Sequence, residues 1–214
     1  MASRYEENIF SVHVATANHI RRRDEENDTM DASLTRMKVT PLRLAGLASI
    51  TPEVHGDSRG YFMEVFNKDT FTDAGLPFDV VEHNQSHSQK NVLRGLHFQY
   101  DPPLSKIVRV VRGKAFFVAV DTRKESQTVG GWEARELSPE TKELFFIPAG
   151  FATGFCALED DTDIEYYFNN HYNPRGETNI AWNDHLINIS WPIENPILSE
   201  RDAGAQSLKD WLAR

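Results

Sequence analysis

Short apolar runs separated by turn residues recur along most of this chain of 214 residues, and they restrict the possible folds more than any other feature. From Met37 onward the runs are rich in Val, Ile, Phe and Tyr, the residues that favour β-strands. The clearest two, 106–112 and 114–121, flank Gly113, and we expect them to form a pair of neighbouring strands. About ten such runs and few helical segments predict an all-β protein, either a sandwich or a jelly roll.

Two short helices are expected within this β-rich region. The segment 68–75 ends in a glycine and is soon followed by a proline, which is typical of a helix C-terminus. A second short helix is expected over 207–212. The segment 148–155 contains one proline and two glycines, and this density of special backbone residues indicates a loop.

The first part of the chain, 1–36, differs from the rest. Its run 21–28 contains charged residues of both signs and nothing apolar to bury, which is typical of a solvated or poorly ordered segment. A short helix is predicted only over 8–20. We therefore expect 1–36 to be an extension, either an alternative start or an arm that contacts another subunit, and 37–214 to be one domain.

Composition excludes several classes of partner. The formal net charge of −9 argues against a nucleic-acid-binding surface, because phosphate groups are bound by basic faces. No run approaches the roughly 18 apolar residues of a membrane span, and the N-terminus lacks the apolar stretch of a signal peptide. The lone cysteine, Cys156, cannot form an internal disulfide and fits a reducing compartment. We expect a cytoplasmic protein that binds neither nucleic acid nor membrane.

The segment 91–99 combines apolar residues with Arg94 and His97. Alternation along a strand places these two side chains on opposite faces, unless Gly95 between them permits a bulge that shifts the alternation. A guanidinium and an imidazole in an apolar strand are costly without partners. Two interpretations stay open. One is a pocket wall with an anion-binding arginine and a proton-transferring histidine, and the other is a core histidine beside a surface arginine.

Four segments, in this order and spacing, resemble the dTDP-4-dehydrorhamnose 3,5-epimerase family of cupins. They are Leu-Arg-Gly-Leu-His-Phe-Gln at 93–99, the run 113–121, Ile-Pro-Ala-Gly-Phe at 147–151 and Leu-Ser-Glu-Arg-Asp at 198–202. The resemblance implies that 37–214 form an all-β cupin jelly-roll β-sandwich with a few short helices. It also implies an isomerase of deoxysugar (rhamnose) biosynthesis. Such an epimerase inverts C3, C5 or both on a nucleotide-linked 4-keto-6-deoxy sugar, with dTDP as the expected nucleotide.

The resemblance also implies chemical roles for four residues. The C–H bonds beside a ketone are acidic, so epimerisation needs a base, a group that stabilises the enolate oxygen, and an acid on the opposite face. His97 matches the family's base, and Asp202 matches the carboxylate that orients it and favours its charged form. Tyr166 matches the acid, and Lys106 matches the cation near the developing oxyanion.

Ten further residues match family positions that contact the nucleotide sugar. Arginines suit its diphosphate because guanidinium groups form forked hydrogen bonds, and one tyrosine matches a ring that stacks near the base. The predicted substrate-binding set is Arg59, Phe62, Glu64, Glu82, Asn84, Arg94, Thr153, Tyr172, Glu177 and Arg201.

Three positions depart from the family pattern. Thr153 stands where the family usually has a histidine, Phe117 where it usually has an aspartate, and Glu82 where it has a glutamine. Thr153 cannot carry a positive charge as the histidine could. Phe117 removes a carboxylate, and Glu82 adds one. These departures leave two alternatives open: a C3-only epimerase or ketoisomerase of a related nucleotide sugar, and a catalytically silent cupin that binds sugar nucleotides.

No metal and no cofactor are expected. A metal-binding cupin usually offers a His-x-His pair, a carboxylate and a third histidine, but this chain has His97-Phe98-Gln99 and Thr153 at those positions. One strong ligand holds a transition metal poorly, and the pair His83 and His87 lacks a third ligand. Besides a small-molecule nucleotide sugar, the expected partner is a second copy. Jelly rolls must cover their sheet edges, and the resemblance implies a homodimer that exchanges strands.

Overall fold

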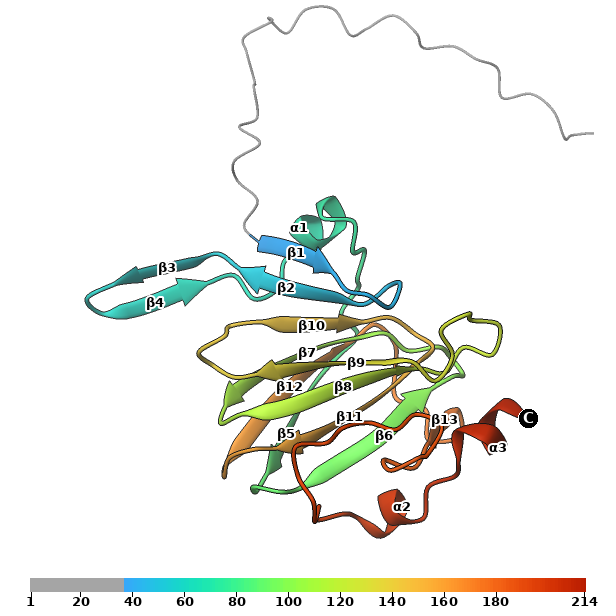
Figure 1. The fold of residues 1–214 in the computed structure, drawn as a ribbon. Helices are drawn as coiled ribbons and strands as arrows, with labels where there is room; N and C mark the ends of the chain where they lie inside the picture. Colours follow the sequence, from blue (N-terminus) through green and yellow to red (C-terminus); the bar gives the residue numbers. More distant parts are fainter. Residues whose placement is uncertain (1–36) are drawn as a thin grey trace, which may run out of the picture. The chain divides into compact units, whose positions relative to one another are not determined.

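A computed structural model describes residues 37–214, so the extension expected over 1–36 and the helix expected over 8–20 lie outside the described residues. The described part consists mainly of antiparallel strands in two large sheets (Figure 1). The six-stranded sheet contains, in spatial order, β1 (Met37–Pro41), β2 (Ala48–Pro52), β10 (Leu144–Ile147), β7 (Lys106–Arg112), β12 (Thr162–Phe168) and β5 (Glu82–Ser88). The five-stranded sheet contains β13 (Glu177–Asn179), β6 (Leu93–Gln99), β11 (Phe151–Ala157), β8 (Ala115–Asp121) and β9 (Trp132–Leu137). A separate hairpin is formed by β3 (Val54–Asp57) and β4 (Gly60–Met63).

The two sheets enclose the main core. Val108 and Phe145 of the six-stranded sheet pack with Phe117 and Phe155 of the five-stranded sheet, and all four are at most 3% exposed. The rings of the last two are stacked, with centroids 5.8 Å apart. This sandwich of antiparallel sheets confirms the predicted all-β class.

Three short helices accompany the sheets. They are α1 (Lys68–Asp73), α2 (Glu200–Ala203) and α3 (Leu208–Leu212). Asn67 caps α1 by accepting hydrogen bonds from two backbone N–H groups, and Ser207 forms a capping box with Asp210 at the start of α3. The predictions of short helices near 68–75 and 207–212 are therefore confirmed. No helix among the described residues is long and apolar enough to cross a membrane.

The outer faces of the sheets carry smaller cores. Phe71 of α1 is fully buried in a cluster with Ile107 and Phe146 of the six-stranded sheet. Leu208 of α3 packs in another cluster with Phe98 of the five-stranded sheet. The helices thus cover apolar side chains that alternate with those of the main core.

The segments 106–112 and 114–121 form strands, but the prediction that they pair with each other is wrong. β7 pairs with β10 and β12, whereas β8 pairs with β11 and β9 in the other sheet. Gly113 between them has a φ of +69°, and a Cβ there would lie 2.9 Å from the Cα of Thr162. The chain therefore turns from one sheet into the other at a point too crowded for a side chain.

The prediction of a loop over 148–155 is also wrong from Phe151 onward. β11 is a fully buried central strand between β6 and β8. Gly154 lies inside it because the neighbouring backbone approaches closely: a Cβ there would lie 2.9 Å from the carbonyl oxygen of Arg94. Gly154 thus reflects close strand contact and not a turn.

Candidate active site

A β-bulge in β6 brings Arg94 and His97 to the same face. His97 lies opposite Thr153 of β11, and Arg94 lies opposite Phe155, so three steps along β6 correspond to two along β11. Since cross-strand partners share a face, both side chains point toward the interior between the two sheets. The bulge that Gly95 was expected to permit is therefore present, and the interpretation as a pocket wall stays a prediction.

His97 contacts a buried carboxylate. Its Nε2 lies 2.5 Å from Oδ1 of Asp202, whose side chain is 3% exposed. Asp202 lies in α2, and its backbone N–H donates to the hydroxyl of the N-cap residue Ser199. Burial raises the pKa of the Asp202 carboxyl. The hydrogen bond and charge of His97, with smaller contributions from Ser199 and the Gly95 backbone, outweigh burial and hold that pKa below its ordinary value.

Lys106 reaches the same space from the opposite sheet. Its Nζ donates to Oγ1 of Thr153 at 2.9 Å, and that hydroxyl lies 3.3 Å from the carbonyl oxygen of His97. The lysine is 8% exposed, and burial lowers its pKa to about 8, although the charge of Glu177 opposes this change. Near neutral pH an ammonium with this pKa remains mostly protonated.

Tyr166 lies on β12 beside the lysine's strand. In the β12–β7 ladder Phe168 is opposite Lys106 and Tyr166 is opposite Val108, so the tyrosine and the lysine share the inner face. The Tyr166 hydroxyl lies 3.0 Å from that of Ser86. Burial raises the pKa of Tyr166 to about 12, against smaller opposing effects of Ser86 and Arg94. The phenol therefore keeps its proton at neutral pH.

Two arginines, Arg94 and Arg201, lie near this group, the second with Glu177 and Tyr172. Arg94 donates from Nε to the hydroxyl of Ser88 at 3.2 Å and from Nη2 to the carbonyl oxygen of His87 at 3.1 Å. Glu177 Oε2 accepts from the Tyr172 hydroxyl at 2.9 Å and from Arg201 Nη2 at 2.7 Å. The two arginines are thus held in place by side chains and backbone of this chain.

Glu82 and Asn84 lie on β5, which pairs with β12. Asn84 is opposite Tyr166 and Glu82 is opposite Phe168, so both share the inner face. Glu82 Oε1 accepts the backbone N–H of Tyr172 at 2.9 Å, and this hydrogen bond is the main cause that lowers the pKa of the Glu82 carboxyl. The glutamate at this position therefore anchors the turn that presents Tyr172.

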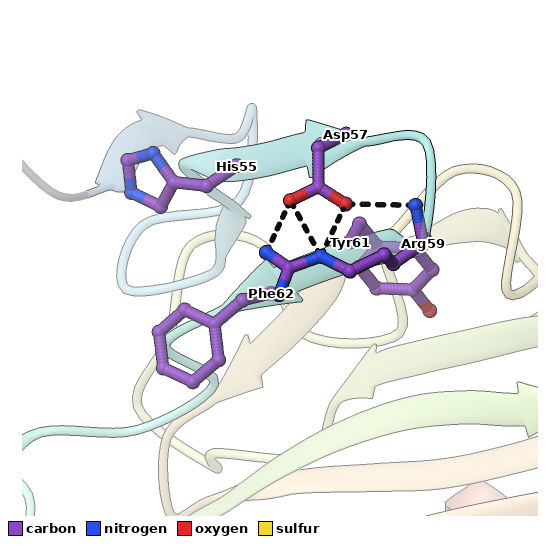
Figure 2. A pocket seen from close by; sticks show the side chains of 7 residues that line it. His55, Asp57, Arg59, Tyr61 and Phe62 are labelled. Carbon is purple, nitrogen blue, oxygen red and sulfur yellow. Dashed lines mark hydrogen bonds and ion pairs between the residues drawn. The ribbon is translucent and has the colours of Figure 1, made fainter.

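Arg59 and Phe62 lie apart from this group, on the hairpin of β3 and β4 (Figure 2). Arg59 forms a forked ion pair with Asp57, with Nε 3.1 Å from Oδ2. Phe62 is 71% exposed and lines an open hollow of about 390 Å³ on the hairpin. The described chain does not bring these two predicted site residues against His97.

Glu64 follows the hairpin and serves a local contact. Its carboxylate accepts from Asn67 Nδ2 at 3.1 Å and from the Thr70 hydroxyl at 3.2 Å, at the N-terminal end of α1. Phe117, one of the three departures, is 1% exposed and packs with Phe145 and Phe155. It therefore belongs to the hydrophobic core that adjoins the candidate site.

Two contributing residues were not predicted from the sequence. Ser86 supplies the hydroxyl beside Tyr166, and Ser199 caps the helix that carries Asp202. Ser199 could have been recognised from the sequence, since a serine three residues before an acidic residue is typical of a helix N-terminus. Ser86 could not, because only the pairing of β5 with β12 places its hydroxyl beside Tyr166. Among the described residues, no group of three or more His, Cys, Asp and Glu could hold a metal ion.

Comparison with known proteins points to one family. The family model described as dTDP-4-dehydrorhamnose 3,5-epimerase matches residues 41–210. An epimerase of that name from Shigella flexneri is 45% identical over 176 residues, which cover 81% of this chain and 97% of the relative.

Solved structures of epimerases also match this chain in fold and sequence. The dTDP-6-deoxy-D-glucose-3,5-epimerase of Legionella pneumophila in complex with dTDP-4-keto-L-rhamnose matches with a TM-score of 0.78 and 39% identity, over 81% of this chain and 93% of that one. A 3′-monoepimerase from Streptomyces bikiniensis in complex with dTDP-quinovose matches with a TM-score of 0.75 and 34% identity, over 79% and 87%. As the four sequence segments predicted, the chain belongs to the dTDP-4-dehydrorhamnose 3,5-epimerase family.

Proposed function

We propose that this chain epimerises dTDP-4-keto-6-deoxyglucose at C3 and C5, by removing and returning protons next to the ketone. The observation that carries the proposal is the contact between His97 and buried Asp202, which faces Lys106 and Tyr166 of the opposite sheet. The similar proteins from Shigella flexneri and Legionella pneumophila are 3,5-epimerases of such sugars, which supports the same chemistry.

His97 acts as the base. A neutral imidazole accepts the proton from C3 or C5, and the electron pair of that C–H bond moves toward the ketone to form an enolate. Asp202 stays ionised at neutral pH, because the pKa of its carboxyl is lowered, and it stabilises the imidazolium that forms. The carboxylate also fixes the orientation of the ring, as a hydrogen-bonded orienting group does in other proton-transfer sites.

Lys106 and Tyr166 complete the reaction from the other sheet. The Lys106 ammonium donates a hydrogen bond to the enolate oxygen, which carries the developing negative charge. Tyr166 gives its proton to the carbon on the face opposite His97, and this inverts the configuration. The tyrosinate then recovers a proton from solvent while His97 loses the one it took, so the site returns to its starting state.

Arg94 and Arg201 bind the diphosphate through charge-assisted hydrogen bonds. Tyr172, which is 51% exposed, offers a ring face for the nucleotide base. Glu82, Asn84 and Glu177 orient these groups. Arg59 and Phe62 contribute from a second copy of the chain, through the exposed β3–β4 hairpin, so the functional unit is a cytoplasmic homodimer that exchanges this element.

The test is deuterium incorporation from heavy water into dTDP-4-keto-6-deoxyglucose, followed by NMR. We expect label at C3 and C5 with the wild-type protein, none with His97→Ala, and normal label with the control His185→Ala, whose side chain is exposed. Label at C3 alone would replace the proposal with a C3-only epimerase. Binding without any exchange would identify a silent sugar-nucleotide-binding protein.

A further inference from the structure

Thr153 occupies the centre of the candidate site. It lies in β11, opposite His97 of β6 on one side and Ala119 of β8 on the other, and it is 5% exposed. Its side chain shares the inner face with His97 because cross-strand partners point the same way. The side chain of Thr153 therefore projects into the space between the two sheets, where it meets the side chain of Lys106 from β7.

The hydroxyl of Thr153 has one proton and two lone pairs, and both kinds of hydrogen bond are used. The carbonyl oxygen of His97, 3.3 Å away, can only accept, so it takes the hydroxyl proton. The lone pairs then remain for Nζ of Lys106 at 2.9 Å. This order makes the hydroxyl an acceptor toward Lys106.

Lys106 depends on this contact. Among residues 37–214, the Thr153 hydroxyl is the one hydrogen-bond acceptor that the ammonium has, and Glu177 acts on it only through its charge. The ring of Phe168 lies 5.8 Å from Nζ and offers no lone pair. A buried ammonium without an acceptor loses its proton more easily and has no fixed direction.

We propose that Thr153 is a positioning residue for the epimerisation: its hydroxyl aims the Lys106 ammonium at the substrate ketone and ties it to the strand that carries His97. The inference rests on the proposed role of Lys106 as the oxyanion-stabilising cation. It replaces the expectation that Thr153 serves as a substrate contact. Thr153, which replaces the family's usual histidine, thus orients the Lys106 ammonium.

Two substitutions of Thr153 distinguish the effect of its hydroxyl group from the effect of its methyl group. Thr153→Val keeps the shape and removes the oxygen, whereas Thr153→Ser keeps the oxygen and removes the methyl group. Thr162→Val is the matched control, because Thr162 is also buried but its hydroxyl donates to the carbonyl oxygens of Lys114 and Glu159 and, among residues 37–214, has no hydrogen bond with Lys106. All three are made in the full chain.

The first measurement follows Lys106 directly and does not require activity. Lysine labelled with carbon-13 at Cε is titrated by NMR, and the Lys106 signal is assigned as the one absent from Lys106→Met. We expect its titration midpoint to fall by about one pH unit or more in Thr153→Val, and to stay at the wild-type value in Thr153→Ser and Thr162→Val. An unchanged midpoint in Thr153→Val would overturn the proposal, whether or not the protein proves to be an epimerase.

The second measurement is the pH profile of kcat and KM with dTDP-4-keto-6-deoxyglucose. We expect kcat of Thr153→Val at neutral pH to fall about ten- to a hundredfold with little change in KM, and Thr153→Ser to restore most of it. A raised KM with unchanged kcat would make Thr153 a substrate contact. A loss of kcat in Thr153→Ser with normal kcat in Thr153→Val would assign the effect to the methyl group, and equal loss in both variants would show that the hydroxyl alone does not account for it; each of these results contradicts the proposal. An inactive wild-type protein would refute the proposed function alone, since the titration still decides the role of Thr153.

Discussion

His97 Nε2 and Asp202 Oδ1 lie 2.5 Å apart although 105 positions separate the two residues in the chain. The histidine comes from the bulged strand β6 and the aspartate from the short helix α2 near the C-terminus. A buried carboxylate at this distance can hold the imidazole in one orientation and stabilise it once it gains a proton.

Replacement of Asp202 by asparagine should abolish most of the activity while leaving the fold intact. The amide keeps the shape but cannot stabilise an imidazolium and can hold the wrong tautomer, so we expect kcat to fall by about 10²- to 10⁴-fold, as for other orienting carboxylates. Steady-state kinetics would measure the loss. Asp210→Asn, at the exposed start of α3, is the control and should retain normal kcat. An Asp202→Asn enzyme with near-normal kcat would remove the carboxylate from the mechanism.

Lys106 should make activity and stability change in opposite directions with pH. Its pKa in the folded protein is lowered to about 8 from 10.5, so kcat should decline as pH rises through about 8. In the same range the unfolded chain binds more protons than the folded one, and the contribution of Lys106 to the free energy of unfolding therefore rises with pH.

The Lys106→Met variant isolates this effect on stability. At pH 7 the variant should be more stable than the wild-type protein because no buried charge remains, and the difference should shrink toward pH 10. Thermal unfolding at several pH values gives the comparison. A stability difference that is independent of pH would show that Lys106 does not titrate in this range.

Mixing two inactive variants should restore activity if the hairpin completes the partner's site. Arg59→Ala and His97→Ala each remove one part of every site in their own homodimers. After subunits exchange, a mixed dimer contains one site with both parts intact, so an equal mixture should recover about a quarter of the wild-type activity. Activity of the mixture is compared with that of each variant alone. No recovery, with exchange verified by mass spectrometry, would place Arg59 outside the partner's site.

Gly113→Ala should destabilise the sandwich more than Gly75→Ala does. Both glycines have positive φ, +69° and +79°, so both substitutions strain the backbone. A Cβ at Gly113 would also lie 2.6 Å from Oγ1 of Thr162, whereas nothing lies within 4 Å at Gly75. We expect an additional loss of about 1–3 kcal/mol in the free energy of unfolding at Gly113, measured by denaturant titration. Equal losses would assign the whole effect to backbone strain.

Local sequence predicted most of the strands and helices, because the formation of each of these elements depends on short-range patterns. Apolar runs such as 106–112 and 114–121 form strands, and the caps at 67 and 207 start helices where expected. The four motif segments predicted the family and its class, an isomerase, and both are confirmed. The roles of individual site residues stay predictions.

Strand pairing was decided only in three dimensions. β7 and β8 are adjacent in the chain yet belong to different sheets, because the crowded turn at Gly113 directs the second strand across the sandwich. The glycine in β11 resembled a turn residue in the sequence, but it is present because the backbone of β6 passes so close. Sequence patterns do not record which distant backbone will lie alongside a strand.

The sequence by itself determined which chemical groups this protein has: a histidine two residues after a glycine, an aspartate near the C-terminus, a lysine and a tyrosine on β-prone runs, and a threonine in place of the usual histidine. Only the tertiary structure decided that Arg94 and His97 share a face, and that Thr153 lies between His97 and Lys106. The physical reason is that strand alternation is local, whereas a bulge and the pairing of distant strands depend on packing across the whole sandwich.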